Sequence, residues 1–253
     1  MGTNYYIPND LLKPFVNSFV ISKNESAQSY KVLPGTSVVM GFQFSGSLSF
    51  SLNDRVRSLS KAGITGLMDA YRVFNNTADT GSVLVMFSEA GASAFFPVPM
   101  HEIFDQSLSL GDLLLDSQMD VIVDRLCEAK DDAGRIAVIE DFLLSRLNPR
   151  NDELVMLAVS MIKQHKGNIK MKKLAGLLNI SVSQFEKRFR QIVGASPKKY
   201  SNIVRLSNIL KAIPEKNRLI DLAFDAGYYD QPHFIKDFKA FTGQSPEQFF
   251  KEK

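Results

Sequence analysis

Two groups of charged and polar side chains recur with the same spacing in the second half of the sequence, 49 residues apart. Lys187 corresponds to Lys236, and Arg190 corresponds to Lys239. Lysine and arginine donate hydrogen bonds to phosphate oxygens and to guanine O6 and N7, and a glutamate such as Glu186 can accept one from cytosine N4. The repeat therefore indicates two related surfaces that could bind nucleic acid.

The residues that usually carry catalysis or metal binding are scattered. The three histidines, His101, His165 and His233, lie far apart, and Cys127 is the single cysteine. A zinc site or a metal-dependent cupin needs several clustered ligands, and acid–base catalysis needs a partner at a useful spacing. We therefore expect no enzyme activity, no metal and no cofactor. We expect Cys127 to be a small buried side chain on an apolar helix face.

Charge is distributed unevenly along the 253 residues. Residues 1–150 contain 12 Lys and Arg against 17 Asp and Glu, whereas residues 151–253 contain 18 against 10. A basic half joined to an acidic half suggests that the basic half meets a polyanion. The single cysteine fits a reducing compartment, and neither an export signal nor an 18-residue apolar segment is visible. We expect a cytoplasmic protein without a membrane span.

The repeat predicts the elements that position these side chains. Ser181 and Asp230 occupy the same place in the two copies, and so do Gly194 and Gly243. Each copy has the features of two helices joined by a tight turn, with a capping residue before the second helix. Phenylalanines at i and i+4 of that second helix are expected in the core: Phe185, Phe189, Phe234 and Phe238.

Local signals define each unit. In the first, residues 171–178 lead, Asn179 takes the turn, and S-x-x-Q from Ser181 has capping-box spacing. In the second, residues 219–226 lead and Gly227 takes the turn. Residues 197–211 predict one connecting helix.

The acidic half predicts a different architecture. Apolar runs at 31–33, 37–44, 47–52 and 82–87 are separated by turn-forming residues, which is typical of the strands of a small barrel or sandwich. Helices are expected from about residue 110, with apolar faces over 115–126 and 132–147. Asn148-Pro149 should end the last of these, and a cap at Asn151 should begin the next. The fold class is therefore α+β, with domains at 1–150 and 151–253.

The basic half resembles the DNA-binding domain of the AraC/XylS family of bacterial transcription regulators. The resemblance rests on G-Y-(x)-D-Q-(x)-H-F-(x)-K-(x)-F-K from Gly227 to Lys239, and on S-P-(x)2-Y-(x)4-R-L from Ser196 to Leu206. It covers about residues 155–250. It implies two recognition helices in successive major-groove segments, one helical repeat of about 34 Å apart. The implied base-facing positions are Ser183, Glu186 and Lys187 in the first helix and Gln231, His233, Ile235 and Lys236 in the second; Gln184, Arg190 and Lys239 complete the DNA-binding set.

The acidic half is similar to the cupin-like sensor and dimerisation domain of some members. The similarity rests on K-V-L-P-G from Lys31, V-L-V-M-F from Val83 and P-x-x-E-x-F from Pro99. It implies a regulatory β-barrel and leaves the ligand-binding residues and the direction of regulation open. Double-stranded DNA is the expected partner, and RNA polymerase, a second copy of the chain and a small-molecule effector are further partners that the resemblance allows. Two alternatives stay open: an architectural, non-specific DNA binder, and a non-metal cupin-like ligand-binding protein with an appended helical domain.

Overall fold

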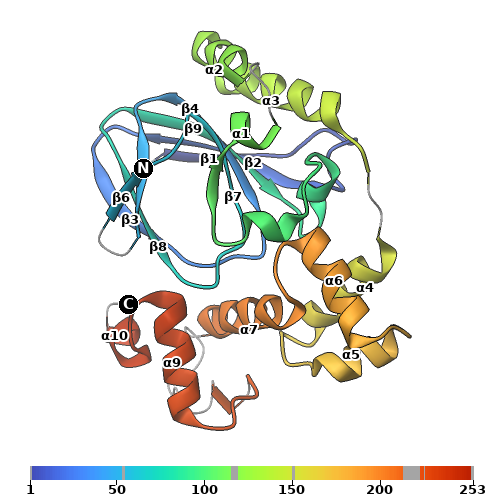
Figure 1. Cartoon of the computed structure of the whole chain (residues 1–253). Coiled ribbons are helices and arrows are strands. Elements are labelled where there is room, and N and C mark those ends of the chain that lie inside the picture. Colours follow the sequence, from blue (N-terminus) through green and yellow to red (C-terminus); the bar gives the residue numbers. More distant parts are fainter. Residues whose placement is uncertain are drawn as a thin grey trace.

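The computed structural model describes residues 2–52, 55–114, 119–149, 152–212, 223–224 and 226–251. Figure 1 shows two parts. The first part of the chain forms β-sheets with helices above them, and the second part forms a group of helices below.

The larger sheet has six antiparallel strands in the order β1-β2-β9-β4-β7-β10. Their bounds are β1 Gly2–Tyr6, β2 Val16–Asn24, β9 Thr80–Phe87, β4 Val39–Ser45, β7 Ala62–Thr65 and β10 Ser107–Ser109. The smaller sheet has four strands in the order β3-β8-β5-β6. Their bounds are β3 Gln28–Val32, β8 Arg72–Asn76, β5 Leu48–Leu52 and β6 Arg55–Ser58.

The expectation of a closed barrel is wrong, because the described strands pair into two separate sheets. Consecutive strands β4 and β5 belong to different sheets, and the pairing of β4 with β9 shifts register between Gln43 and Ser45. Such a bulge bends a strand and interrupts its ladder. The two sheets therefore face one another without a continuous ring of hydrogen bonds.

Strand β9 shows how the larger sheet uses its two faces. Val83, Val85 and Phe87 are fully buried in the main hydrophobic cluster. Helices α1 (Leu110–Leu114), α2 (Met119–Glu128) and α3 (Asp132–Arg146) contribute to the same cluster and lie on one side of the sheet (Figure 1). The alternate residues of β9, beginning at Ser82, face the smaller sheet, since successive strand side chains point to opposite faces.

The helical part contains both repeated units. Its elements are α4 Glu153–Gln164, α5 Met171–Leu177, α6 Val182–Val193, α7 Pro197–Ala212, α9 Gln231–Thr242 and α10 Pro246–Lys251. The leading helix expected at 219–226 lies mostly outside the described residues, as does the cap expected at Asn151. In the described part, Asp152 caps α4 by accepting a hydrogen bond from the Val155 amide at 3.1 Å.

The two helix-turn-helix units differ in what they pack against. The first shares one hydrophobic cluster with the sheets, which includes Phe96 and Met100 as well as Phe185 and Tyr200. The second has a separate cluster formed with the C-terminal part of α7, and Leu33 of the β-sheet part packs against it. The first unit is therefore continuous with the N-terminal core, whereas the second contacts that part of the chain at fewer places.

Most of the expected elements are present. The strands β3, β4, β5 and β9 and the helices α3, α5, α6, α7 and α9 match their predicted positions within a few residues. The prediction that Cys127 is buried is wrong: its side chain is exposed, and its Sγ lies 3.2 Å from the carbonyl oxygen of Phe44. It lies near the end of α2, where its Sγ reaches strand β4 but the side chain stays open to solvent. None of the described helices is long and apolar enough to cross a membrane.

Candidate nucleic-acid interface

The first helix-turn-helix unit is set by its turn and its cap. Asn179 adopts a left-handed conformation with φ of 51°, which lets α5 end and the chain reverse. The Ser181 side chain accepts a hydrogen bond from the Gln184 amide at 3.3 Å and so caps α6. Phe185 and Phe189 are fully buried, as their spacing predicts. The opposite side of α6 is left free for another molecule.

That opposite side carries the first group of predicted DNA-binding residues. All five are exposed: Ser183, Gln184, Glu186, Lys187 and Arg190. Arg188, which the sequence analysis did not single out, has a different role. Its Nε and Nη2 donate to the two carboxylate oxygens of Asp152 at 2.9 and 2.8 Å. Because Asp152 also caps α4, this bidentate pair fixes α6 against the start of α4.

The second unit is built by the same means. Gly227 takes the turn with φ of +76°, and the Asp230 side chain accepts a hydrogen bond from the His233 amide at 2.8 Å. Pro232 lies in the first turn of α9, where a missing amide costs no intrahelical hydrogen bond. Phe234 and Phe238 are buried, as predicted.

The outer side of α9 carries the second group. Gln231, His233, Lys236 and Lys239 are exposed, and Ile235 is 37% exposed. His233 also has a local partner, because its Nε2 lies 3.5 Å from the Asp237 carboxylate. The structure therefore brings each predicted group onto one helix face.

Two exposed aromatic side chains of the second unit were not predicted from the sequence. Tyr229 is 95% exposed and Phe224 is 69% exposed, although large aromatic side chains are usually covered. Tyr229 directly precedes the cap of α9, whereas its neighbour Tyr228 is buried and donates to Asp237 at 3.2 Å. Burial raises the pKa of the Tyr228 hydroxyl above its ordinary value. Position before the cap was the one signal in the sequence that could have indicated Tyr229.

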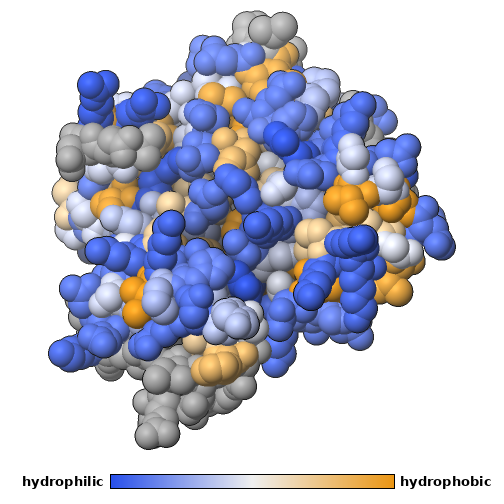
Figure 2. Space-filling view, turned by 60° about the horizontal axis from the view of Figure 1, so that its bottom comes forward, coloured by the Kyte–Doolittle hydropathy of each residue, from blue (hydrophilic) through white to orange (hydrophobic). Residues whose placement is uncertain are grey.

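The surface around the two helices is mainly hydrophilic. Figure 2 shows the helical side of the molecule, where hydrophobic residues form separate patches within a hydrophilic surface. Exposed lysines on this part of the chain include Lys172 and Lys173 of α5 and Lys198 at the start of α7. This distribution fits contact with phosphate groups better than burial against an apolar partner.

Polar contacts join the helical part to the sheets. Lys199 of α7 pairs with Asp69 at 2.6 Å, and Lys163 of α4 pairs with Glu89. The Lys199 ammonium also lies 4.3 Å from the centre of the Phe104 ring. These contacts connect the helical part, which carries the candidate DNA-binding faces, to the N-terminal part at several points.

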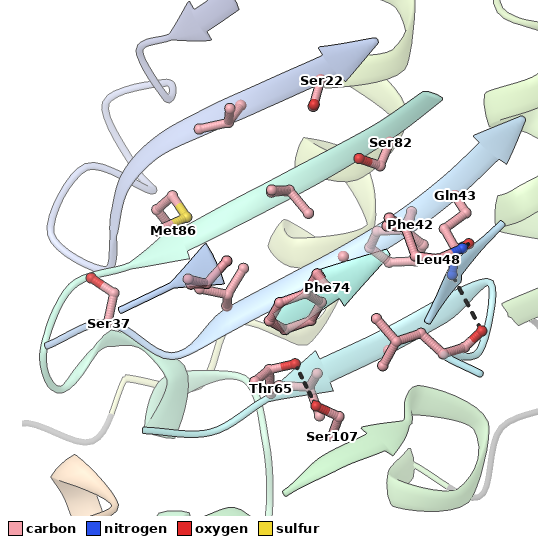
Figure 3. A pocket seen from close by; sticks show the side chains of 18 of the residues that line it. Ser22, Ser37, Phe42, Gln43, Leu48, Thr65, Phe74, Ser82, Met86 and Ser107 are labelled. Atoms are coloured by element: carbon pink, nitrogen blue, oxygen red, sulfur yellow. Dashed lines mark hydrogen bonds between the residues drawn. The ribbon is translucent and has the colours of Figure 1, made fainter. Parts of the chain in front are cut away.

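A second candidate site is a cavity of about 610 Å³ between the two sheets. Figure 3 shows that its wall includes Ser82 and Met86 of β9, Phe42 of β4 and Phe74 of the smaller sheet. The volume is within the range of small-molecule sites. Among the described residues, no group of three or more histidine, cysteine, aspartate or glutamate side chains could hold a metal ion.

Comparison with known proteins identifies the helical part. The family model described as a helix-turn-helix domain matches residues 174–252, which include both turns and both helices α6 and α9. The chain is a helix-turn-helix transcriptional regulator of the AraC type. It belongs to a class of regulators and is not an enzyme. A second family model, described as a domain of unknown function (DUF6597), matches residues 4–109 of this regulator.

Individual relatives of this AraC-type regulator are distant. An uncharacterised HTH-type transcriptional regulator of Haemophilus influenzae is 24% identical, over 81% of this chain and 74% of its own length. The Msm operon regulatory protein of Streptococcus mutans is 32% identical, over 46% of this chain and 44% of its own length. Among solved structures, ToxT of Vibrio cholerae has a TM-score of 0.46 and 13% identity, covering 92% of this chain and 96% of that one.

Proposed function

We propose that this regulator recognises a specific operator by placing α6 and α9 in successive segments of the major groove. The observation that carries the proposal is the correspondence of the two exposed faces. Lys187 and Lys236 stand at equivalent positions of the two helices, and each is exposed on the side opposite the buried phenylalanines. A non-specific architectural binder would need mainly charge and apolar wedges, not two different sets of polar side chains.

The side chains suggest roles at the bases. Lys187 and Lys236 can donate to guanine, Glu186 can accept from cytosine, and Gln231 can pair with adenine. Ile235 can contact a thymine methyl group. Ser183 and His233 complete the proposed base-facing set, whereas Gln184, Arg190 and Lys239 are assigned to the phosphates beside it.

The test uses an operator selected from random duplex DNA by the full-length protein. If each lysine contacts a base, Lys187→Ala and Lys236→Ala should each cost about 1–3 kcal/mol and relax preference in different half-sites, about 10 base pairs apart. Lys61→Ala, at an exposed lysine of the β-sheet part, is the matched control. A lysine that contacts only phosphate would instead weaken all DNA equally and reduce the salt slope by about one. Unchanged preference in both variants would contradict the site assignment.

The N-terminal part is proposed to regulate this binding. Support comes from the cavity between its sheets and from the ion pairs that join it to α4 and α7. The same proposal includes a cytoplasmic location, contact with RNA polymerase, and a homodimer formed by residues 1–150. Val121, on α2, is 58% exposed and could lie in such a dimer, although Ile139 and Leu143 of α3 are already buried in the monomer core. Sedimentation of residues 1–150 at tens of micromolar tests the dimer, and a purely monomeric species would exclude it.

Residues 1–150 and 151–253 are proposed as separate folding units. In the second segment, α4, α6 and α9 each begin with a side-chain cap, and each repeated unit buries its own aromatic side chains, which favours an independent domain. Thermal unfolding of residues 151–253 alone, followed by circular dichroism, should be cooperative. A gradual, non-cooperative transition would contradict the boundary.

A further inference from the structure

The chemistry of the cavity between the sheets is set by the register of three neighbouring strands. Ser22 of β2 is paired with Ser82 of β9, which is paired on its other side with Gln43 of β4. Two residues along, Val20 is paired with Leu84, and Leu84 with Gly41. All six of these residues line the cavity. The wall therefore has a polar row beside an apolar row.

The polar row offers hydroxyl groups and no open amide. The side-chain amide of Gln43 is hydrogen-bonded within the protein. Its Nε2 donates to the carbonyl oxygens of Leu59 and Ser60 at 3.3 and 2.8 Å, and its Oε1 accepts from the Leu48 amide at 2.7 Å. Ser82 is only 4% exposed. Within the described residues, its hydroxyl makes no hydrogen bond. Its residue lines the cavity, so a ligand there can hydrogen-bond to a hydroxyl that the described protein groups leave free.

The apolar row is shaped by glycine. Gly41 is paired with Leu84 on one side and with Gly63 on the other, so two adjacent positions of this wall carry no side chain. A Cβ at Gly41 would lie 3.1 Å from Leu84 Cδ2. Across the cavity, the rings of Tyr30 and Phe74 stack with centroids 6.1 Å apart. The space is therefore bordered by aliphatic and aromatic carbon.

None of the described residues that line this cavity carries a charge. Arg72 approaches its wall and donates to the Ser107 hydroxyl at 3.0 Å, but its charge is paired with Asp105 at 2.9 Å. Moving a charged ligand group from water into such a space without a counter-ion carries a large free-energy cost. The lining thus selects against carboxylates, phosphates and ammonium groups.

We propose that the effector is a neutral, mainly apolar small molecule with a hydrogen-bonding group placed at Ser82. This inference rests on the proposed regulatory role of the N-terminal part, and it adds the chemical class of the ligand. The apolar body would lie along Leu84 and Met86 toward Phe74. Its polar group would donate to or accept from the Ser82 hydroxyl.

The test compares two fluorescent probes with one aromatic skeleton, using the full-length protein. N-phenyl-1-naphthylamine is neutral, and 8-anilino-1-naphthalenesulfonate adds only a sulfonate. The neutral probe should bind at least tenfold more tightly. 1-Decanol should displace it at concentrations at least tenfold lower than decanoate or decylammonium at pH 7. Equal or reversed preference, or no binding of either probe, would overturn the inference.

Variants locate the probe. Leu84→Trp and Met86→Trp fill the cavity from two positions of β9 and should each reduce binding of the neutral probe at least tenfold. Leu157→Trp, at a leucine of α4 that is 54% exposed, should leave binding unchanged. Unaltered probe binding in a folded cavity-filling variant would contradict the proposed site. Operator binding is measured in the same samples. If the wild-type protein binds its operator but neither probe, only this inference is contradicted. If it binds the neutral probe but prefers no DNA sequence, only the proposed function is contradicted.

Discussion

Replacing Asp152 should separate two interactions that meet at one carboxylate. The side chain caps α4 and also holds Arg188 of the first recognition helix through two hydrogen bonds. Loss of an N-cap costs about 1 kcal/mol. A bidentate pair whose arginine is 45% exposed contributes about 0.5–1 kcal/mol, because water screens it. Asp152→Ala should therefore lower the free energy of unfolding by about 1.5–2 kcal/mol.

Two further variants divide this total. Asp152→Asn keeps a good capping oxygen and loses the charge, so it should cost only about 0.5–1 kcal/mol. Arg188→Met should cost a similar amount, and its effect should vanish when it is added to Asp152→Ala, since the pair is already absent. Urea denaturation of the wild type and of these four variants, the double variant included, followed by circular dichroism, gives these differences. If Asp152→Asn is as damaging as Asp152→Ala, or if the double variant loses the sum of both single effects, the assignment of cap and ion pair is wrong.

Two further predictions concern the fold. Gly243→Ala should lower the free energy of unfolding by at least about 1 kcal/mol, because φ of Gly243 is +78° and the new Cβ would lie 2.5 Å from Tyr71 Cε1. Gly176→Ala, at an open position of a helix, should raise the free energy of unfolding by up to about 1 kcal/mol. Thermal unfolding compares the two variants, and equal melting temperatures for both would contradict this reasoning. The hydrogen bond from Lys23 holds the pKa of Asp132 below its ordinary value of 3.8, so the carboxylate contributes stability above that pH and loses it as pH falls through the lower, folded-state pKa. Asp132→Asn should accordingly be less stable than wild type at pH 7 and approach it below about pH 3, as measured by urea denaturation at each pH; a gap that widens in acid would refute the assignment.

The helical half was more predictable than the sheet half because its signals are local. Asn179, Ser181 and Asp230 act within a few residues of their own positions, so their spacing alone defines the turns and caps. The exposed faces of α6 and α9 then follow from helical periodicity around the buried phenylalanines. The pairing of the strands is not local: β2 pairs with β9, which lies far along the chain, and neither β1 nor β2 was anticipated.

The cavity could not be predicted for the same reason. Ser22, Ser82 and Gln43 are ordinary as separate residues, and they form one row only because three distant strands align in register. Likewise, the exposure of Cys127 depends on how the end of α2 packs on the sheet, which helical periodicity does not show. Arg188 resembled any solvated arginine of a helix until the fold placed Asp152 opposite it.

The unequal attachment of the two helix-turn-helix units has a consequence for protein engineering and for evolution. The second unit completes its core with the C-terminal part of α7, from Ile203 onward. Among the described residues of the β-sheet part, Leu33 packs against this core and Tyr71 lies beside Gly243. A chimaera joined within α7 before Ile203 would replace the second recognition helix together with almost all of its supporting core. Exchange of the first unit would instead cut through the cluster that contains Met100 and Phe96. New operator preferences are therefore more easily acquired through the second unit, while the first stays matched to its own sensor.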